Sequence, residues 1–548
     1  TSMSTVCLLF CEAGLFISEI SFLLIPLFRK CFIMVQKFYC FVLLGLMSLI
    51  SFPLYTQQPL RIVVDPAAIR QTIDNIGASG CWFSEGIGRY WHKSQKDSIA
   101  QYLFSRELDK SGRLQGIGLS AWRFNIGGGT TEQGEKSGIK TYVKRVEGFL
   151  GPDGTYDWNK QSGYQWFLEK AREYGVEDLI AFSNTPPVNF TKNGLGFKTE
   201  KNYITNLRDD KYTDYAEFLA NVIRHFDSKG IHFNYISPVN EPQWDWSNKM
   251  GEMNQEGSPW HNKDIYRIVR LLDSTLQKNK MSTKIIMPEA ATLRHLYDEG
   301  GQAGRQIQHF FNRQSPYDVT TLPSVKQVVA GHSYFTDAGD SNRVSVRQRL
   351  KDTTDLYKVP FWQSEYSMLG DGFREQKKGK IPAMDCALFL AKVIHTDLVV
   401  ANAAAWQLWN VYEPGDADFN TRYYVIALRS NDSNTAGSFR VTKNLWALGH
   451  YSRFIRPGMQ RLDISRSDKS DHVEASSNLM VSAFKDKKGR YVMVLINYTD
   501  KPLTVDCTIG KKKSRGATLY TTTAADDMNM QPTVPPDLHK LSLAARSI

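Results

Sequence analysis

Eight short apolar segments, rich in β-branched and aromatic residues, alternate with longer amphipathic stretches from about residue 75 to residue 409. Between residues 215 and 226, for example, apolar side chains recur on one helical face, and Gly230 supplies a stop. Strands that alternate with helices predict a parallel sheet, and eight such units predict a (β/α)8 TIM barrel with long loops. The candidate strands are Ile76–Gly80, Leu119–Asn125, Leu179–Ser183, Tyr235–Val239, Lys284–Pro288, Gln327–Tyr334, Pro360–Ser364 and Ala403–Trp409.

A doubly wound parallel sheet is the structural alternative to the barrel. Dinucleotide-binding sheets of that kind carry a GxGxxG sequence after the first strand, and the glycines at 127–129 lack that spacing. We therefore favour the barrel, with further helices over residues 162–174, 265–277 and 384–399.

After about Pro457 the pattern changes to short strand-like segments separated by polar turns, and no helix is predicted there. The strand-like Arg61–Asp65 precedes the barrel and is able to pair with these segments. The expected fold is α/β, with a barrel over residues 75–456 and a C-terminal β-sandwich over 457–548. A strand within residues 57–74 joins the sandwich from the N-terminal side.

Residues 1–56 are predicted to be a leader segment. An apolar run from Phe38 to Pro53 follows Met34 and Lys37, and this order is typical of a secretory signal peptide. We expect an upstream extension, then a signal peptide from about Met34, and a secreted, periplasmic or cell-surface protein. A true N-terminal membrane anchor is the alternative.

The net charge of +11 does not identify a partner. Lys and Arg number 67 against 56 Asp and Glu, and the basic residues are scattered except at Lys511–Lys513 and Arg515. No compact basic motif accompanies the charge, so we expect no nucleic-acid partner. The cysteines show no CxxC spacing and the histidines no HExxH, so the sequence predicts no metal site.

A glutamate stands at the C-terminal end of each of two predicted strands. Glu241 comes after the fourth strand, and Pro242 disfavours the right-handed α region there, while Glu365 ends the seventh. In a barrel the C-terminal strand ends share one mouth, and three β/α units span the 365 − 241 = 124 residues between them. Paired carboxylates of this kind carry out glycoside hydrolysis. Two unrelated surface glutamates are the alternative.

Aromatic side chains cluster at the same predicted mouth. Sugars present apolar C–H faces, which aromatic rings bury well, although any one of these rings taken alone is more easily explained as core. Trp122 and Trp362 in particular can face either way on their strands. The cluster comprises Trp82, Trp122, Trp244, Trp246, Trp260, Tyr334, Trp362, Tyr366, Trp406 and Trp409.

These segments together resemble glycoside hydrolase family 30, in the clan of retaining (β/α)8 glycosidases. The resemblance implies that Glu241 is the acid/base, that Glu365 is the nucleophile and that Asn240 contacts the 2-hydroxyl of the reacting sugar. It extends over nearly the whole predicted exported chain. It rests on residues 74–80 (DNIGASG), 122–125 (WRFN), 239–242 (VNEP), 362–365 (WQSE) and 406–410 (WQLWN).

The resemblance also implies roles for residues around the two carboxylates. Arg123 is expected to brace the nucleophile, Tyr334 to lie near it, and Trp409 to form the wall of the cleaved sugar's subsite. The remaining substrate-binding candidates are Trp82, Asn184, Trp244, Trp246, His332 and Trp406.

Within the family, residues 183–187 (SNTPP), 193–194 (NG) and 240–246 (NEPQWDW) look most similar to endo-β-1,6-galactanases. That similarity predicts a secreted retaining endo-glycosidase acting on the β-1,6-galactan side chains of type II arabinogalactan. The expected partner is a polysaccharide, with no cofactor, no obligate protein partner and a monomeric state. The alternatives are β-1,6-glucanase, glucosylceramidase-like or glucuronoxylanase activity, a transglycosylase that uses the same residues, or a non-catalytic glycan-binding protein.

Overall fold

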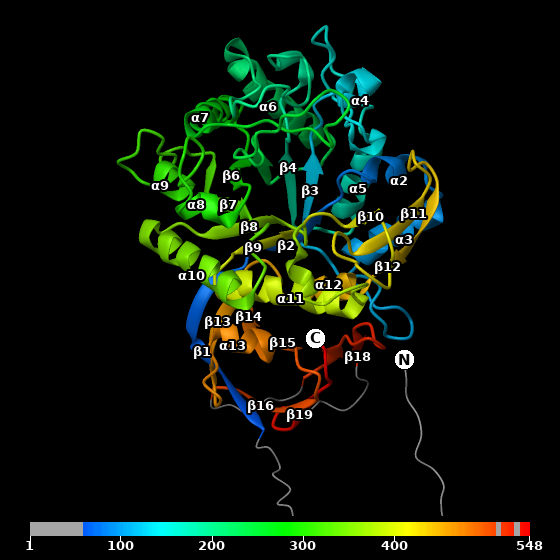
Figure 1. Cartoon of the computed structure of the whole chain (residues 1–548), viewed down its shortest axis with the longest axis vertical. Coiled ribbons are helices and arrows are strands. Elements are labelled where there is room, and N and C mark those ends of the chain that lie inside the picture. Colours follow the sequence, from blue (N-terminus) through cyan, green and yellow to red (C-terminus); the bar gives the residue numbers. More distant parts are fainter. Residues whose placement is uncertain (1–58, 511–516, 531–536) are drawn as a thin grey trace, which may run out of the picture. The chain divides into compact units, whose positions relative to one another are not determined.

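Eight parallel strands, β2 to β9 in chain order, close into a barrel in which β9 pairs with β2 (Figure 1). The computed structural model describes residues 59–510, 517–530 and 537–548, so the predicted leader over residues 1–56 lies outside the described residues. The barrel strands are β2 (Asn75–Ser79), β3 (Ala121–Asn125), β4 (Asp178–Phe182), β5 (Tyr235–Ser237), β6 (Lys284–Ala290), β7 (Val325–His332), β8 (Phe361–Tyr366) and β9 (Ala405–Leu408).

The closed barrel confirms the predicted fold and excludes the doubly wound alternative. Each predicted strand overlaps one observed strand. Strands such as β2, β3 and β4 are buried along their whole length, because helices cover the outside of the sheet and side chains fill the inside. Strands buried on both faces are apolar without interruption, which is why they stand out in the sequence.

Helices cover the outside of the barrel (Figure 1). The predicted apolar face of α6 is buried, and this helix ends at Ser228, with Gly230 at a φ of 70°. The predicted helices over α5, α7 and α11 are likewise present. The outer helices are α2 (Ser84–Tyr90), α3 (Lys93–Phe104), α4 (Thr130–Gln133), α5 (Ser162–Glu173), α6 (Tyr212–Ser228), α7 (Asn262–Lys278), α8 (Leu293–Tyr297), α9 (Gln306–Phe310), α10 (Asp340–Tyr357), α11 (Ala383–Val399) and α12 (Lys443–Ser452).

A small apolar cluster fills the inside of the barrel below the mouth. Trp362 is fully buried in it, its ring meets Tyr235 edge-to-face at 5.0 Å, and its indole N–H donates to Asp74 at 2.8 Å. Trp122 points to the other side of the barrel wall, where its ring meets Phe104 at 5.1 Å. Both tryptophans are therefore core residues, one of the two placements that the sequence leaves open.

The C-terminal module is a six-stranded sheet with a separate two-stranded ribbon. The N-terminal strand β1 (Leu60–Thr72) lies inside that sheet, antiparallel to β13 and parallel to β16, as the strand-like Arg61–Asp65 predicts. The sheet is formed by β1, β13 (Gln460–Arg466), β14 (Leu479–Lys485), β15 (Tyr491–Asn497), β16 (Leu503–Ile509) and β19 (Leu541–Leu543), and the ribbon by β17 (Tyr520–Thr521) and β18 (Asn529–Met530).

Two features of the fold differ from the sequence prediction or go beyond it. The expectation of no helix after Pro457 is wrong, because α13 (His472–Ser477) forms behind a complete capping box. In that box the Asp471 carboxylate accepts from the backbone of Glu474, and the Glu474 carboxylate accepts from the backbone of Asp471. A three-stranded sheet, β10 (Tyr412–Pro414), β11 (Ile426–Ser430) and β12 (Gly437–Val441), also follows the last barrel strand.

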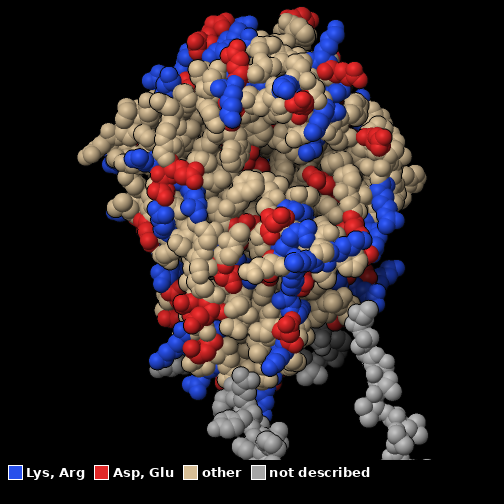
Figure 2. All heavy atoms as spheres, viewed as in Figure 1, with Lys and Arg blue, Asp and Glu red and all other residues tan. Residues whose placement is uncertain are grey.

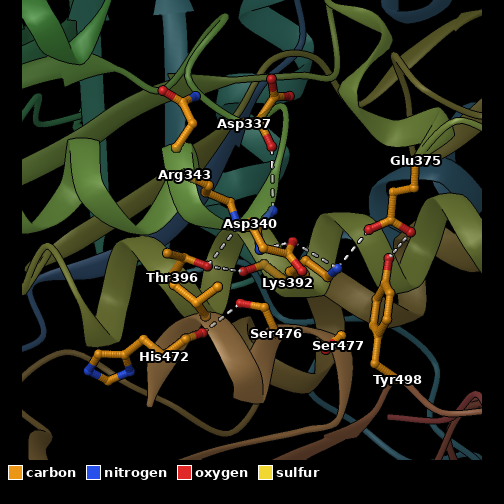
Figure 3. Close-up of polar contacts among 12 residues, drawn as sticks. Asp337, Asp340, Arg343, Glu375, Lys392, Thr396, His472, Ser476, Ser477 and Tyr498 are labelled. Carbon is orange, nitrogen blue, oxygen red and sulfur yellow. Dashed lines mark hydrogen bonds and ion pairs between the residues drawn. The ribbon is translucent and has the colours of Figure 1, made fainter.

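Helices α10 to α12 lie between the barrel strands and the C-terminal sheet (Figure 1), with α11 in contact with β14 and β15. The close-up in Figure 3 shows the ion pairs at this junction. Lys392 of α11 is buried and donates to Glu375 at 2.6 Å and to Asp340 at 3.3 Å. Tyr498, directly after β15, donates to the other oxygen of Glu375 at 2.7 Å, and its ring faces the Lys392 ammonium at 3.6 Å.

Acidic and basic side chains are interspersed over the face shown in Figure 2, without a broad area of one sign. Among the described residues, no helix combines the length and the apolarity that a membrane crossing requires.

We predict that Lys392→Met destabilises the protein by about 3 kcal/mol, because it leaves the partly buried carboxylate of Glu375 without its cation, while Asp340 keeps only Arg343. Urea unfolding measures the change. Lys487→Met, at an exposed lysine, is the control and is expected to stay within about 0.5 kcal/mol of wild type. Equal stability of the two variants would contradict the prediction.

Candidate active site

The C-terminal ends of five barrel strands bring charged side chains together at the mouth. β3 carries Arg123, β6 carries Glu289, β7 ends at His332 and β8 carries Glu365, while Glu241 follows β5. Side chains at this end of a barrel are the ones that line an active site. Figure 2 shows a hollow over the ends of β3 and β4, with acidic atoms recessed in it.

The backbone at Glu241 turns sharply after β5. Its φ is 44°, which confirms that the residue before Pro242 leaves the right-handed α region, and its N–H donates to the backbone carbonyl of Glu289 at 2.9 Å. The indole N–H of Trp246 donates to the Glu241 carbonyl at 3.0 Å. Gly257 lies against the Trp246 ring so closely that a Cβ there would collide with it. The carboxylate is therefore aimed by a fixed loop.

Glu365 is held by two donors. Arg123 donates to one carboxylate oxygen at 2.7 Å, and the Tyr334 hydroxyl donates to the other at 2.9 Å. The Arg123 guanidinium also lies 4.2 Å above the ring of Phe182, which packs it from below. Burial and the charge of Glu365 raise the pKa of Tyr334 well above its ordinary value, so that its hydroxyl stays a donor.

His332 connects three carboxylates. Its Nδ1 lies 3.0 Å from Glu241 and 3.6 Å from Glu365, and its Nε2 lies 3.1 Å from Glu289. The three surrounding carboxyl groups favour a proton on each ring nitrogen, which is the imidazolium form of the ring. Although burial alone would lower the pKa of His332, the three carboxylates raise it to about 10.

Glu289 is a member of this cluster that the sequence analysis missed. It is fully buried, accepts from the Ser364 hydroxyl at 2.5 Å and lies 3.8 Å from Arg123. Burial would raise its pKa, but Arg123, His332 and Ser364 together hold it below the ordinary value. A sequence signal was available, because Glu289 directly follows the predicted strand Lys284–Pro288, as Glu241 follows its own strand.

The two carboxylates predicted from strand ends lie close together. Glu241, His332 and Glu365 each place one ligand-type atom within 4.8 Å of the others, so an oxygen of Glu241 is that near an oxygen of Glu365. Burial is the main cause that raises the pKa of Glu241, and the charge of Glu365 adds to it, while His332 opposes both. With Glu241 protonated, the cations Arg123 and His332 balance the anions Glu289 and Glu365.

The same three atoms form the one group of residues with metal-ligand spacing in the described part of the chain. Each of their side chains is already hydrogen-bonded within the cluster, through His332 to Glu241 and Glu289 and through Arg123 to Glu365. Protons and the Arg123 cation therefore account for the arrangement of this group.

A row of asparagines continues the site beside Glu241. Asn240 donates to Asn184 at 3.0 Å, and Asn184 donates to Asn125 at 3.4 Å. At the two ends of the row, Asn240 Oδ1 and Asn125 Nδ2 are buried without a hydrogen-bond partner among the described residues. Buried polar groups left in this state favour a bound partner with its own donors and acceptors.

Five of the ten predicted aromatic residues lie at this end of the barrel: Trp82, Trp244, Trp246, Tyr334 and Trp409. Trp260 is instead buried against Tyr212 and Tyr215 of α6, and the buried Tyr366 donates to Asp337. Trp82 and Trp409 meet edge-to-face at 5.1 Å, Trp246 contacts Glu241 as described, and the exposed Trp244 lies 6.3 Å from Phe335. The structure does not bring Trp406 to this group. Trp406 is fully buried on the helix side of the barrel wall, where its indole donates to Asp397 of α11 at 2.9 Å.

A paired, enclosed set of carboxylates in the mouth of a (β/α)8 barrel with aromatic walls is the site of a glycoside hydrolase. The chain belongs to O-glycosyl hydrolase family 30, whose model matches residues 59–420. A curated relative is the endo-beta-1,6-galactanase of Hypocrea rufa, 21% identical over 80% of this chain and 84% of that protein.

Solved structures share the fold. A conserved exported protein from Bacteroides fragilis is 33% identical, and the match covers 89% of this chain and 98% of that one with a TM-score of 0.82. The catalytic domain of family 30 xylanase C from Talaromyces cellulolyticus is 19% identical, over 89% of this chain and 98% of its own, with a TM-score of 0.61. The chain is thus a glycoside hydrolase of family 30, with a polysaccharide as the substrate that this family implies.

Proposed function

We propose that this glycoside hydrolase is a retaining endo-glycosidase that cleaves β-1,6-linked galactan by double displacement. In this proposal Glu365 is the nucleophile and Glu241 the acid/base. The observation that carries it is the short distance between the two carboxylates, with an oxygen of each within 4.8 Å of the other. Retaining enzymes hold these groups about 5–5.5 Å apart, and inverting ones about 6.5–9.5 Å apart.

In the first step a Glu365 oxygen attacks the anomeric carbon while Glu241 gives its proton to the leaving oxygen, and the glycosidic bond breaks. In the second step Glu241 takes a proton from water, whose oxygen attacks the same carbon and releases Glu365. Each step inverts the configuration at the anomeric carbon, so the product has the same anomeric configuration as the substrate. The raised pKa of Glu241 and the two donors on Glu365 suit these separate roles.

The endo-beta-1,6-galactanase of Hypocrea rufa supports galactan as the substrate, since its similarity extends over 84% of that protein's length. The loop that carries Trp244 and Trp246 belongs to the segment that most resembles such enzymes. Both residues follow Glu241 within five positions, and the Trp246 indole donates a hydrogen bond to the Glu241 carbonyl. Subsite loops of this kind distinguish substrates within one fold.

We further propose that the chain is exported and acts as a monomer. The apolar run after Met34 supports export, as does its similarity to the Bacteroides fragilis protein described as exported. A β-1,6-galactan of an arabinogalactan is too large to enter a cell, so export and this substrate agree.

Replacing either proposed catalytic carboxylate should impair turnover, and the two replacements should differ in the size of the loss and in the response to azide. We expect Glu365→Gln to lower kcat by roughly 10⁴-fold or more, because no nucleophile is left. Glu241→Ala should lose less on an aryl glycoside with an activated leaving group, and azide should restore its rate by forming a β-glycosyl azide. Rates and product anomers by NMR measure both effects.

The matched controls for these variants are Glu132→Gln and Glu252→Gln, at glutamates outside the cluster. Both should hydrolyse at the wild-type rate. Full activity in Glu365→Gln would overturn the assignment of the nucleophile, and an inverted product anomer would overturn the double displacement.

The protonation state of Glu241 predicts how activity depends on pH. Glu241 must be protonated to act as an acid, so activity is lost as the pH rises through its pKa. The His332 imidazolium lowers that pKa, so His332→Gln should raise it and move the alkaline limb of kcat/KM upward by roughly one pH unit. A pH–rate profile measures the limb. A downward shift, or an equal shift in the remote His309→Gln, would contradict this reading.

A substrate panel tests the linkage and the sugar. We expect hydrolysis of linear β-1,6-galactan to a ladder of oligosaccharides, faster than that of β-1,6-glucan by at least about 10-fold, because one misplaced hydroxyl leaves a buried polar group unpaired. Glucuronoxylan should not be hydrolysed. Product sizes by chromatography distinguish endo from exo cleavage, and preferred cleavage of β-1,6-glucan would replace galactan in the proposal.

A further inference from the structure

A small polar cluster beside the aromatic wall contains hydrogen-bonding groups that the protein itself does not satisfy. Trp82 is buried against Trp409, yet its indole N–H finds no hydrogen-bond partner among the described residues. The Lys144 ammonium lies 4.4 Å from the centre of the Trp82 ring, and the described part of the chain gives it neither a hydrogen bond nor an ion pair. The buried indole N–H favours a bound acceptor, and the partly buried Lys144 ammonium lies beside it as a second donor.

The acceptor in the same cluster is Glu413 of β10. Asn410, directly after Trp409, donates to Glu413 Oε1 at 3.1 Å, and no described residue donates to Oε2. Burial raises the pKa of Glu413 and lowers that of Lys144, and each side chain opposes the effect on the other. The charges of Lys144 and Glu413 therefore influence each other, although the two side chains form no salt bridge among the described residues.

This cluster lies on the wall that leads to the proposed nucleophile. Trp409 contacts Trp82 on one side and Phe182, at 6.0 Å, on the other. The Phe182 ring in turn supports Arg123, the partner of Glu365. Trp409 therefore connects the cluster to the residues that support the proposed nucleophile.

We propose that Lys144, Glu413 and the Trp82 indole form a subsite for a neutral hexopyranose unit with two free vicinal hydroxyl groups. Lys144 and Trp82 donate to hydroxyl oxygens, and Glu413 accepts a hydroxyl proton. Because a cation and an anion are both present, the cluster suits hydroxyl groups. It disfavours a uronate, whose carboxylate Glu413 repels.

The inference rests on the proposed function and adds how that substrate is selected. A β-1,6 linkage uses O1 and O6, so O3 and O4 of each unit remain free for Lys144 and Glu413. A 1,4-linked chain, or a unit branched at O3, blocks one of this pair. The subsite therefore selects unbranched 1,6-linked units, and the C4 epimer carries O4 in a different direction.

The test uses Lys144→Met and Glu413→Gln in the full chain. Each is expected to lower kcat/KM for linear β-1,6-galactotetraose about 10- to 100-fold, mostly through KM, because a charged hydrogen bond is lost. Each added to Glu365→Gln should weaken calorimetric binding of the same tetrasaccharide by a similar factor. Lys140→Met, at an exposed lysine of the same loop, is the matched control and should stay within about twofold of wild type.

Thermal unfolding shows whether a variant is folded, and the isosteric Glu413→Gln carries the test if Lys144→Met is not. If the wild type cleaves or binds another neutral glycan instead, the proposed function fails. The variants are then measured on that glycan, where the same losses still support the subsite. Unchanged binding and kcat/KM in folded Lys144→Met and Glu413→Gln would overturn it, as would losses confined to uronate-capped chains.

Discussion

His332 donates a hydrogen bond from each ring nitrogen to a carboxylate, to Glu241 on one side and to Glu289 on the other. These two contacts fix the orientation of the ring, and the surrounding carboxylates raise the pKa of His332 to about 10, which favours the imidazolium. Glu289 plays no chemical part in bond cleavage under our proposal. Its negative charge stabilises the buried imidazolium of His332. Without that anion, the imidazolium would keep only Glu365, 3.6 Å from its Nδ1, as an anionic neighbour when Glu241 is protonated.

The barrel supplies this geometry through irregularities in its strands as much as through their regular pairing. The register between β6 and β7 shifts next to Glu289, and the register between β7 and β8 shifts so that His332 pairs with Glu365. An extra residue in a strand turns the following side chain to the other face. Glu289 and Ser364 therefore point at the same centre as Glu365, which a regular alternation would not allow for neighbours in one strand.

The sequence predicts the regular part of this structure and fails where the irregular part begins. Eight strands buried on both faces are visible as apolar runs, and Glu241 and Glu365 at their ends are visible as carboxylates. The sequence does not single out Glu289 because the predicted strand stops at Pro288, two residues before β6 ends at Ala290. Trp406 was placed at the mouth, although one residue along a strand decides between the mouth and the helix side. When both faces of a strand are buried, the hydrophobicity of its residues does not show which side chains point to the mouth and which to the helices.

The C-terminal module gains a specific role from these contacts. The chain leaves β8 just after Glu365 and enters a loop that reaches Glu375 before α11 begins. Glu375 is held there by Lys392 of α11 and by Tyr498 of the module, so the loop is tied at its far end to a separate sheet. A loop fixed at both ends loses little further conformational entropy when a glycan binds. The module therefore holds the far end of the loop that follows β8, the strand that carries the proposed nucleophile.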